Sequence, residues 1–326
     1  MESQCQVALF SWLGSPSTQA FELQTVSLTQ YQEGHAPASS QRLRLVFDMC
    51  QQQVISDWIA SLSAPVAIAS LNRTSGLCGL EIALNSPLSE AQWASLAAID
   101  LVDIFEPKNT LTRLDVPGLL VMDMDSTAIQ IECIDELAAM AGVGEAVAEV
   151  TERAMQGELD FEQSLRERVA KLTGASSDII ETLCRDLPLM PGLIEMIAEL
   201  KSHGWKLVLA SGGFTPFVGH LKQLLKLDAA YANQLVIVDD KLTGEVTGQV
   251  VDAQYKADVV GRCGDQWQIA AGQRVAIGDG ANDIPMVRAA DFGIAFHAKP
   301  KLAGVADAQI NKLDLRVLPY YLQLNQ

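Results

Sequence analysis

The sequence predicts an α/β fold, a doubly wound parallel sheet that carries a helical insertion and follows a small N-terminal α/β domain. From about Gly118 onward, short apolar runs alternate with amphipathic helical patterns, which is typical of βαβ units and a parallel sheet. Over residues 131–190 this alternation stops, and helical patterns follow one another with no strand between them. The length of 326 residues also exceeds the usual span of one domain. We therefore expect a small α/β domain over 1–115 and a larger domain over 118–326, with a helical cap at about 131–190.

The apolar runs of the larger domain have the length of single strands, and the segments between them have apolar residues at helical spacing. The predicted strands are residues 119–124, 206–212, 234–239, 274–280 and 292–296. The predicted crossover helices are residues 191–204, 214–227 and 283–290. A β-prone run between two glycines at 241–250 predicts a hairpin, and the proline-containing segment 106–118 predicts a linker. The smaller domain has strand-like and helix-like patterns but no catalytic motif.

The composition limits the partners of the protein. With 23 basic and 40 acidic residues the net charge is −17, which disfavours binding to nucleic acid or to an anionic membrane surface. A phosphate-bearing substrate would need a metal ion or a few well-placed cations at its site. No apolar stretch reaches the roughly 18 residues of a membrane-spanning helix, and no signal peptide is evident, so we expect a cytoplasmic protein. The six cysteines form no C-x-x-C pair, which favours isolated reduced thiols.

The motif DMDST at 123–127 follows a predicted strand, where ligands bind in open α/β sheets. Asp123 and Asp125 are two residues apart on extended backbone and therefore point the same way. A second acidic motif, GDGANDIPM at 278–286, follows another strand and brings Asp279, Asn282 and Asp283 to the same edge. Carboxylates held together require a cation. Oxygen ligands without a His or Cys cluster favour Mg²⁺ over zinc.

Two further features between these motifs suit a phosphate group. Ser211 and Gly212, in ASGGF, end another predicted strand, where a hydroxyl and backbone N–H groups can cradle an anion. Lys256 could supply the fixed positive charge that a transferring phosphoryl group needs. Each feature also has an ordinary structural interpretation, a tight turn for the glycines and a solvated surface side chain for the lysine.

The four motifs occur in the order that is typical of the haloacid dehalogenase superfamily, and residues 118–300 resemble a phosphatase of that group. Within the insertion, IECIDELA, AMQGELDFEQSLRERV and LPLMPG resemble phosphoserine phosphatases. This resemblance implies that Glu132 receives the ammonium group of the substrate, that Arg168 receives its carboxylate, and that Phe161 and Met155 close over it. The planar fork of Arg suits a carboxylate. Taken alone, Glu132 could begin a helix and Arg168 could lie on a solvated face.

The resemblance also implies a mechanism with two carboxylates. Asp123 attacks phosphorus and forms an aspartyl-phosphate, while Asp125 protonates the departing seryl oxygen and later deprotonates water. Mg²⁺ is held by the side chains of Asp123 and Asp279 and by the backbone carbonyl of Asp125, and Asp283 orients the site. The expected activity is Mg²⁺-dependent hydrolysis of O-phosphoserine to serine and phosphate, the last step of serine biosynthesis.

Three groups are expected to bind the phosphoryl oxygens: Lys256, Ser211 and Asn282. Other interpretations stay open. A phosphoacceptor signalling module also uses an Asp at a strand end with Mg²⁺ and Lys, although the second Asp and the insertion disfavour it. Another small phosphate monoester, such as phosphothreonine or a sugar phosphate, is the alternative substrate. In longer bacterial relatives an N-terminal extension resembles a regulatory amino-acid-binding fold, and a homodimer is the expectation from frequency alone.

Overall fold

The computed structural model describes residues 2–15, 19–39, 41–62, 64–107 and 111–325, with side chains from residue 8 onward. It divides into two compact units, which are described separately. Unit 1 contains Met1–Pro117, Pro191–Gly204 and Ala308–Gln326, and unit 2 contains Gly118–Met190 and Trp205–Asp307. Two segments of the predicted domain 118–326 thus belong with the N-terminal residues. The division into domains 1–115 and 118–326 stays a prediction about independent folding. The predicted linker lies partly outside the described residues, at 108–110.

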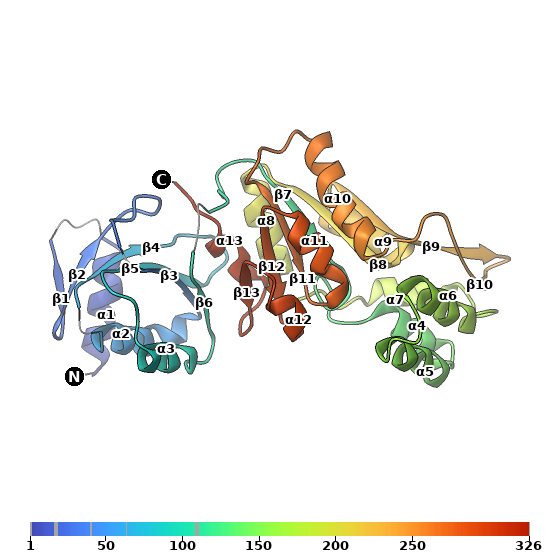
Figure 1. Cartoon of the computed structure of the whole chain (residues 1–326), viewed down its shortest axis with the longest axis horizontal. Helices are drawn as coiled ribbons and strands as arrows, with labels where there is room; N and C mark the ends of the chain where they lie inside the picture. Colours follow the sequence, from blue (N-terminus) through green and yellow to red (C-terminus); the bar gives the residue numbers. More distant parts are fainter. Residues whose placement is uncertain (1, 16–18, 40, 63, 108–110, 326) are drawn as a thin grey trace. The chain divides into compact units, whose positions relative to one another are not determined.

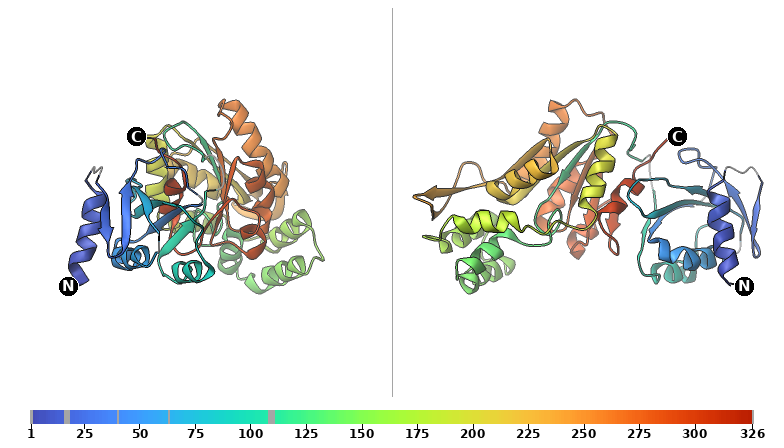
Figure 2. Two further views of the ribbon diagram at one scale, coloured as in Figure 1. Left: turned by 60° about the vertical axis from the view of Figure 1, so that its left-hand side comes forward. Right: turned by 180° about the vertical axis from the view of Figure 1, so that it is seen from behind.

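Unit 1 contains a six-stranded, mainly antiparallel sheet with the strand order β1-β2-β4-β5-β3-β6. Its helices α1, α2 and α3 cover one face of this sheet (Figures 1 and 2), because Leu9, Ile55 and Leu96 are buried in one core with Leu43 and Ile82 of the strands. The elements are α1 (Glu2–Leu13), β1 (Phe21–Leu23), β2 (Val26–Gln30), β3 (Gln41–Phe47), the 3-10 turn η1 (Met49–Gln51), α2 (Gln52–Ala60), β4 (Val66–Ser70), β5 (Cys78–Leu84), α3 (Glu90–Ala97), β6 (Val102–Phe105), α8 (Leu193–Ser202), β13 (Ala308–Ile310), η3 (Leu315–Val317) and α13 (Leu318–Tyr321).

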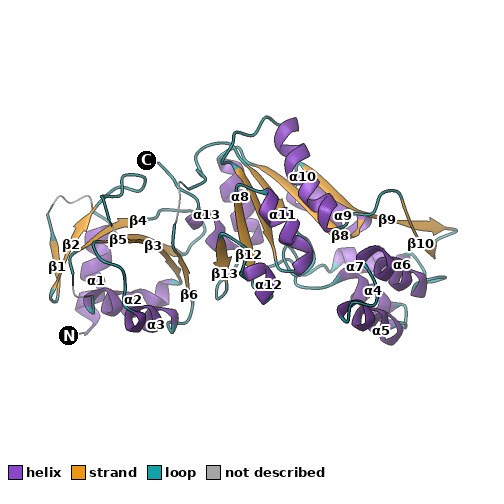
Figure 3. Cartoon of the chain, in the orientation of Figure 1, coloured by secondary structure: helices purple, strands orange, loops and turns teal. Residues whose placement is uncertain are grey.

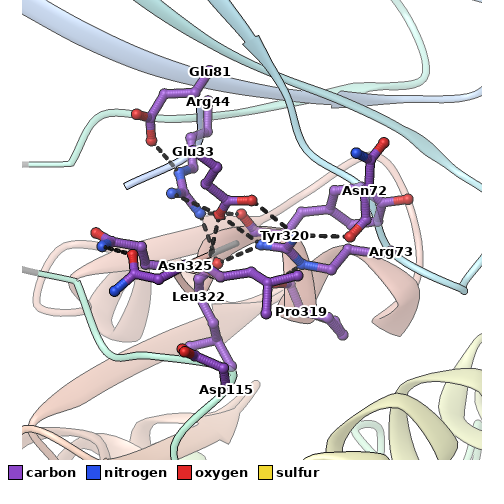
Figure 4. A network of polar contacts seen from close by, with 12 residues as sticks. Glu33, Arg44, Asn72, Arg73, Glu81, Asp115, Pro319, Tyr320, Leu322 and Asn325 are labelled. Atoms are coloured by element: carbon purple, nitrogen blue, oxygen red, sulfur yellow. Dashed lines mark hydrogen bonds and ion pairs between the residues drawn. The ribbon is translucent and has the colours of Figure 1, made fainter. Parts of the chain in front are cut away.

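A buried ionic network fastens the C-terminal segment of unit 1 to its sheet (Figure 4). Arg44 of β3 is fully buried and donates to Glu81 Oε2 at 2.7 Å and to Glu33 Oε1 at 3.2 Å. Its Nη1 also donates to the backbone carbonyl oxygens of Tyr320 and Leu322, each at 2.7 Å. Buried cations need both opposite charge and full hydrogen bonding, and Arg44 has both.

A second arginine extends the same network. Arg73 donates to Glu33 Oε1 at 2.8 Å and to the carbonyl oxygens of Pro319 and Leu322 at 2.9 and 2.8 Å. The backbone N–H of Leu324 donates to Glu33 Oε1 at 2.9 Å. Two arginines and one glutamate therefore hold the backbone of residues 319–324, although no side chain in that stretch carries charge.

Unit 2 contains the predicted parallel sheet, with the strands in the order β10-β9-β8-β7-β11-β12. The pairs from β9 to β12 are parallel, and β10 pairs antiparallel with β9. The segment 241–250 is therefore not a hairpin by itself, which is what the sequence suggests, but supplies the second strand of a hairpin with β9. Helices α10 and α11 pack on one face, where Val259 and Met286 are buried with Val208 and Ala276 of the strands. The elements are β7 (Leu119–Met122), β8 (Lys206–Phe214), α9 (Thr215–Leu225), β9 (Ala229–Val238), β10 (Lys241–Thr247), α10 (Ala253–Gln266), β11 (Arg274–Gly278), η2 (Ala281–Asp283), α11 (Ile284–Ala289), β12 (Phe292–Phe296) and α12 (Pro300–Ala303).

The insertion after β7 is helical, as predicted. It consists of α4 (Cys133–Met140), α5 (Gly144–Met155), α6 (Phe161–Lys171) and α7 (Asp178–Arg185), and no strand lies between these helices (Figure 3). Helix α6 begins with a capping box, in which Asp160 accepts from the N–H of Gln163 and Gln163 accepts from the N–H of Asp160. The α/β class with a parallel sheet and a helical insertion is therefore confirmed.

Two further findings concern the described residues. None of their helices is both long enough and apolar enough to cross a bilayer. The cysteines among them whose side chains are described, Cys50, Cys78, Cys133, Cys184 and Cys263, are free thiols.

Candidate active site

The carboxyl ends of three neighbouring parallel strands bring the predicted site residues of unit 2 together. Strand β7 lies between β8 and β11, and all three run in the same direction. Asp123 follows β7, Asp279 follows β11, and Ser211 lies near the end of β8. Polar groups separated by more than 150 residues in the sequence therefore share one edge of the sheet, where ligands bind in open α/β folds.

Lys256 joins the first and last acidic motifs through two short ion pairs. Its Nζ lies 2.7 Å from Asp123 Oδ1 and 2.8 Å from Asp283 Oδ1. The three side chains are buried, with Lys256 only 1% exposed. Asp123 Oδ1 also accepts from the N–H of Met124 at 2.8 Å, so both contacts orient the carboxylate through one oxygen. The interpretation of Lys256 as a solvated surface residue is wrong, because α10 points it into the site.

Three carboxylates at this edge are suited to a divalent cation. One oxygen each of Asp123, Asp279 and Asp283 lie within 4.8 Å of one another. Burial and the Asp283 carboxylate raise the pKa of Asp123, against the opposing charge of Lys256. Burial and Asp283 likewise raise the pKa of Asp279 to about 6. One lysine therefore does not neutralise the cluster, and an all-oxygen donor set fits a hard cation.

The second oxygen of Asp283 is engaged by the backbone of its own loop. Asp283 Oδ2 accepts from the N–H groups of Asp279 and Gly280 at 3.2 and 3.0 Å. A hydrogen-bonded Asp283 between Lys256 and this loop is suited to orienting Asp279. Thr127 adds a contact that the sequence analysis did not identify, since its buried Oγ1 donates to Asp279 Oδ1 at 3.4 Å.

Asp125 occupies a different electrostatic environment from Asp123. Its Oδ1 accepts from the N–H of Cys133 at 3.1 Å. Burial and the nearby carboxylate of Glu132 raise the pKa of Asp125 to about 7. A carboxyl group with this pKa can both donate and accept a proton near neutral pH, which is what an acid–base catalyst requires.

The glycine-rich loop of β8 lies next to Asp125. The N–H of Gly213 donates to the fully buried Ser211 Oγ at 2.9 Å. A Cβ atom on Gly213 would lie 3.0 Å from Asp125 Oδ2 and 3.0 Å from Ser211 Oγ, so a larger residue would crowd both groups. A Cβ on Gly212 would lie 3.0 Å from the Phe161 ring. The insertion therefore reaches this loop through Phe161.

The insertion carries the other predicted residues on different helices. Glu132 precedes α4 and accepts from Ser126 Oγ at 2.8 Å, while Arg168 lies in α6. Burial lowers the pKa of the Arg168 guanidinium, and the carboxylates of Asp135, Glu132 and Asp125 oppose that shift. The hydrogen bond of Arg168 in this structure is to its own helix, from Nε to the carbonyl oxygen of Ser164 at 3.4 Å, so its contact with a substrate stays a prediction.

The surroundings of two predicted substrate-binding residues, Met155 and Asn282, give less support to their predicted roles. Met155 ends α5 with its side chain 75% exposed, and it borders a hollow of about 370 Å³ that none of the aspartates of the site lines. Asn282 is half-buried in η2, next to Asp283. The roles of both residues stay predictions.

Asn233 of β9 is a polar residue of the site region that the sequence analysis missed. It is 2% exposed, and its Nδ2 donates to the carbonyl oxygen of Gly212 at 2.8 Å. The only local signal was the amide pair Asn233 and Gln234 at the start of an apolar run, which by itself is common.

Known proteins resemble this chain across the region that carries the site. The family model for haloacid dehalogenase-like hydrolases matches residues 118–291. The phosphoserine phosphatase of Haemophilus influenzae is 55% identical over 213 residues, which cover 65% of this chain and 68% of that protein. A crystal structure of a probable phosphoserine phosphatase from Vibrio cholerae has a TM-score of 0.72 at 43% identity and covers 86% of each chain.

A solved structure described as a phospho-aspartyl intermediate analogue of phosphoserine phosphatase is 42% identical, with a TM-score of 0.60, over 64% of this chain and 99% of that one. These similarities agree with the buried carboxylates and the lysine at the ends of the parallel strands. The chain therefore belongs to the haloacid dehalogenase-like hydrolases, in the branch that includes the phosphoserine phosphatases.

Proposed function

We propose that this chain is a Mg²⁺-dependent phosphatase that hydrolyses O-phosphoserine to serine and phosphate through an aspartyl-phosphate. The observation that carries the proposal is the pair of carboxylates after β7, with Asp123 held by buried Lys256 and Asp125 with a pKa near 7. A carboxylate that a lysine holds in place, beside a carboxyl group that can exchange a proton near neutral pH, is the arrangement that nucleophilic and acid–base steps need together. The similarity to proteins named phosphoserine phosphatase supports the substrate.

In the first step, a carboxylate oxygen of Asp123 attacks phosphorus as the bond from phosphorus to the seryl oxygen breaks. Asp125 gives its proton to that oxygen, and serine leaves as a neutral alcohol. In the second step Asp125 takes a proton from water and the water oxygen attacks phosphorus. The bond from phosphorus to the Asp123 oxygen breaks, which regenerates the carboxylate and releases inorganic phosphate. The solved phospho-aspartyl analogue of a relative supports this intermediate.

The carboxylates of Asp123 and Asp279 and the backbone carbonyl of Asp125 would hold the Mg²⁺ ion, with Asp283 orienting them. When bound, the ion offsets the negative charge of the phosphoryl oxygens. Lys256 supplies further positive charge at the same oxygens, and the half-buried Asn282 contributes an amide.

The substrate groups away from phosphorus would contact the insertion and the β8 loop. Glu132 receives the ammonium group and Arg168 the carboxylate, which are the charge types and shapes they match. Ser211 and Gly212 donate to the phosphate. Phe161 and Met155 would close over the substrate, so that the insertion excludes bulk water during the first step.

The wider role follows from this chemistry. An enzyme that releases serine from phosphoserine completes serine biosynthesis, and we expect it in the cytoplasm. A homodimer and a regulatory amino-acid site in residues 1–115 are further expectations.

The direct experiment is phosphate release from purified protein with O-phospho-L-serine, glycerol phosphate and p-nitrophenyl phosphate, each with Mg²⁺ and with EDTA. We expect strong, Mg²⁺-dependent preference for phosphoserine and no turnover by Asp123→Asn. Equal rates on all three substrates would reject phosphoserine as the substrate. Stable phosphorylation without turnover would favour a phosphoacceptor signalling module.

A further inference from the structure

Asn233 bridges two segments of unit 2 that carry groups of the site. Its side chain is nearly fully buried in β9, and both ends of its amide are used. Nδ2 donates to the carbonyl oxygen of Gly212 at 2.8 Å, and Oδ1 accepts from the N–H of Val251 at 2.8 Å. A buried amide that is satisfied at both ends is fixed in orientation.

The first bond replaces a missing contact between strands. The register of β8 against β9 shifts between Ala210 and Phe214, so the loop from Ser211 to Gly213 leaves the regular ladder. Gly212 is half-buried, and a carbonyl shielded from water in such a bulge needs another donor. The Asn233 amide supplies this donor to Gly212.

Holding that carbonyl also sets the direction of the next N–H. A trans peptide is planar, and its C=O and N–H point in opposite directions. The carbonyl of Gly212 points at Asn233, so the N–H of Gly213 points away from it, to Ser211 Oγ at 2.9 Å. Asn233 therefore orients the backbone donor and the hydroxyl beside Asp125.

The second bond reaches the helix of Lys256. Val251 immediately precedes Asp252, which caps α10 by accepting from the N–H of Tyr255 at 2.8 Å. Lys256 lies in the first part of this helix, with its Nζ on Asp123. The side-chain amide of Asn233 thus sets the spacing between the β8 loop and the start of α10.

We propose that Asn233 is a positioning residue for phosphoryl transfer, which orients the Ser211–Gly213 loop relative to Lys256 without touching the substrate. This inference rests on the proposed phosphatase function. A misplaced donor weakens contacts that form in the transition state more than contacts that only hold the amino-acid part of the substrate. Loss of Asn233 should therefore lower kcat and weaken the binding of phosphate-like inhibitors.

The test uses the full chain with two substitutions and one matched control. Asn233→Asp keeps the acceptor for Val251 and removes the donor to Gly212, and Asn233→Leu removes both bonds without burying a charge. The control is Thr243→Val on β10. It removes a side-chain hydrogen bond of 3.2 Å to the carbonyl oxygen of Val236, which lies on β9 as Asn233 does. Each protein is assayed for kcat and KM with O-phospho-L-serine, for inhibition by orthovanadate, and for thermal unfolding.

We expect kcat to fall about 10-fold or more in both Asn233 variants, with the orthovanadate inhibition constant rising by a similar factor and KM changing less than about 3-fold. Thr243→Val should change only the unfolding temperature. An unchanged orthovanadate constant in folded Asn233 variants would overturn the proposal, because loss of active protein lowers apparent kcat without altering that constant. Failure of both variants to fold would also overturn it and assign Asn233 to folding. Phosphate release by the unaltered chain, measured first, tests the phosphatase function separately.

Discussion

Replacing Arg44 by methionine should selectively destabilise unit 1. The substitution keeps an apolar side chain of similar length but removes the donors to Glu33, Glu81 and two carbonyl oxygens. Glu33 retains Arg73 at 2.8 Å, whereas Glu81 is left with the Tyr31 hydroxyl at 3.1 Å and with Arg42 at 3.9 Å. Breaking a buried ion pair in this way costs about 3–5 kcal/mol. For a unit of this size, that corresponds to a fall of roughly 6–20 °C in the unfolding temperature.

Differential scanning calorimetry would measure this fall, with Arg42→Met as the matched control on the same strand. Arg42 is 30% exposed and has one contact of 3.9 Å with Glu81, so its loss should cost no more than about 1 kcal/mol. Deleting residues 319–326 should lower the same transition, and adding Arg44→Met to that deletion should then cost less than it does in the full chain. Equal unfolding temperatures for Arg44→Met and Arg42→Met would refute the reasoning.

Three further predictions concern the site of unit 2. Lys256→Met leaves the carboxylates of Asp123 and Asp283 without their shared cation, and should lower kcat by about 100-fold or more while circular dichroism still shows a folded chain; activity within a few-fold of normal would contradict its role. Gly213→Ala places a Cβ 3.0 Å from two groups of the site and should lower kcat about 10-fold, and an unchanged rate would mean that the loop adjusts freely. Arg168→Ala should lower kcat/KM for phosphoserine about 100-fold but that for p-nitrophenyl phosphate only slightly, and equal losses would reject the carboxylate contact.

The part of the site that lies at strand ends could be predicted because its determinants are local. An apolar run followed by Asp123 or Asp279 specifies both a strand and the residue at its carboxyl end, and parallel strands bring those ends together. Strand β12 (Phe292–Phe296) has the bounds that the sequence predicts.

Contacts over long sequence separations could not be predicted in this way. Lys256 lies in a helix whose start signal is Asp252, but its ion pairs depend on where α10 packs. The hydrogen bond from Asn233 to Gly212 depends on the register shift between Ala210 and Phe214 of β8. The return of residues 308–326 to unit 1 could not be predicted either, since the contacts with Arg44 are made by backbone carbonyl groups, which any sequence carries.

The buried network of unit 1 has a consequence for synthesis on the ribosome. Arg44 and its acceptor on Tyr320 are 276 residues apart, and every residue of unit 2 is translated between them. At about 5–20 residues per second, the first sheet waits roughly 15–55 s for the carbonyls that complete its polar core. During that interval Arg44 already has Glu33 and Glu81 as partners but lacks the two carbonyl acceptors, so its Nη1 donors must remain hydrated or be shielded by a chaperone. Unit 2 is therefore the part of the chain that can finish folding first, although it is encoded in the middle.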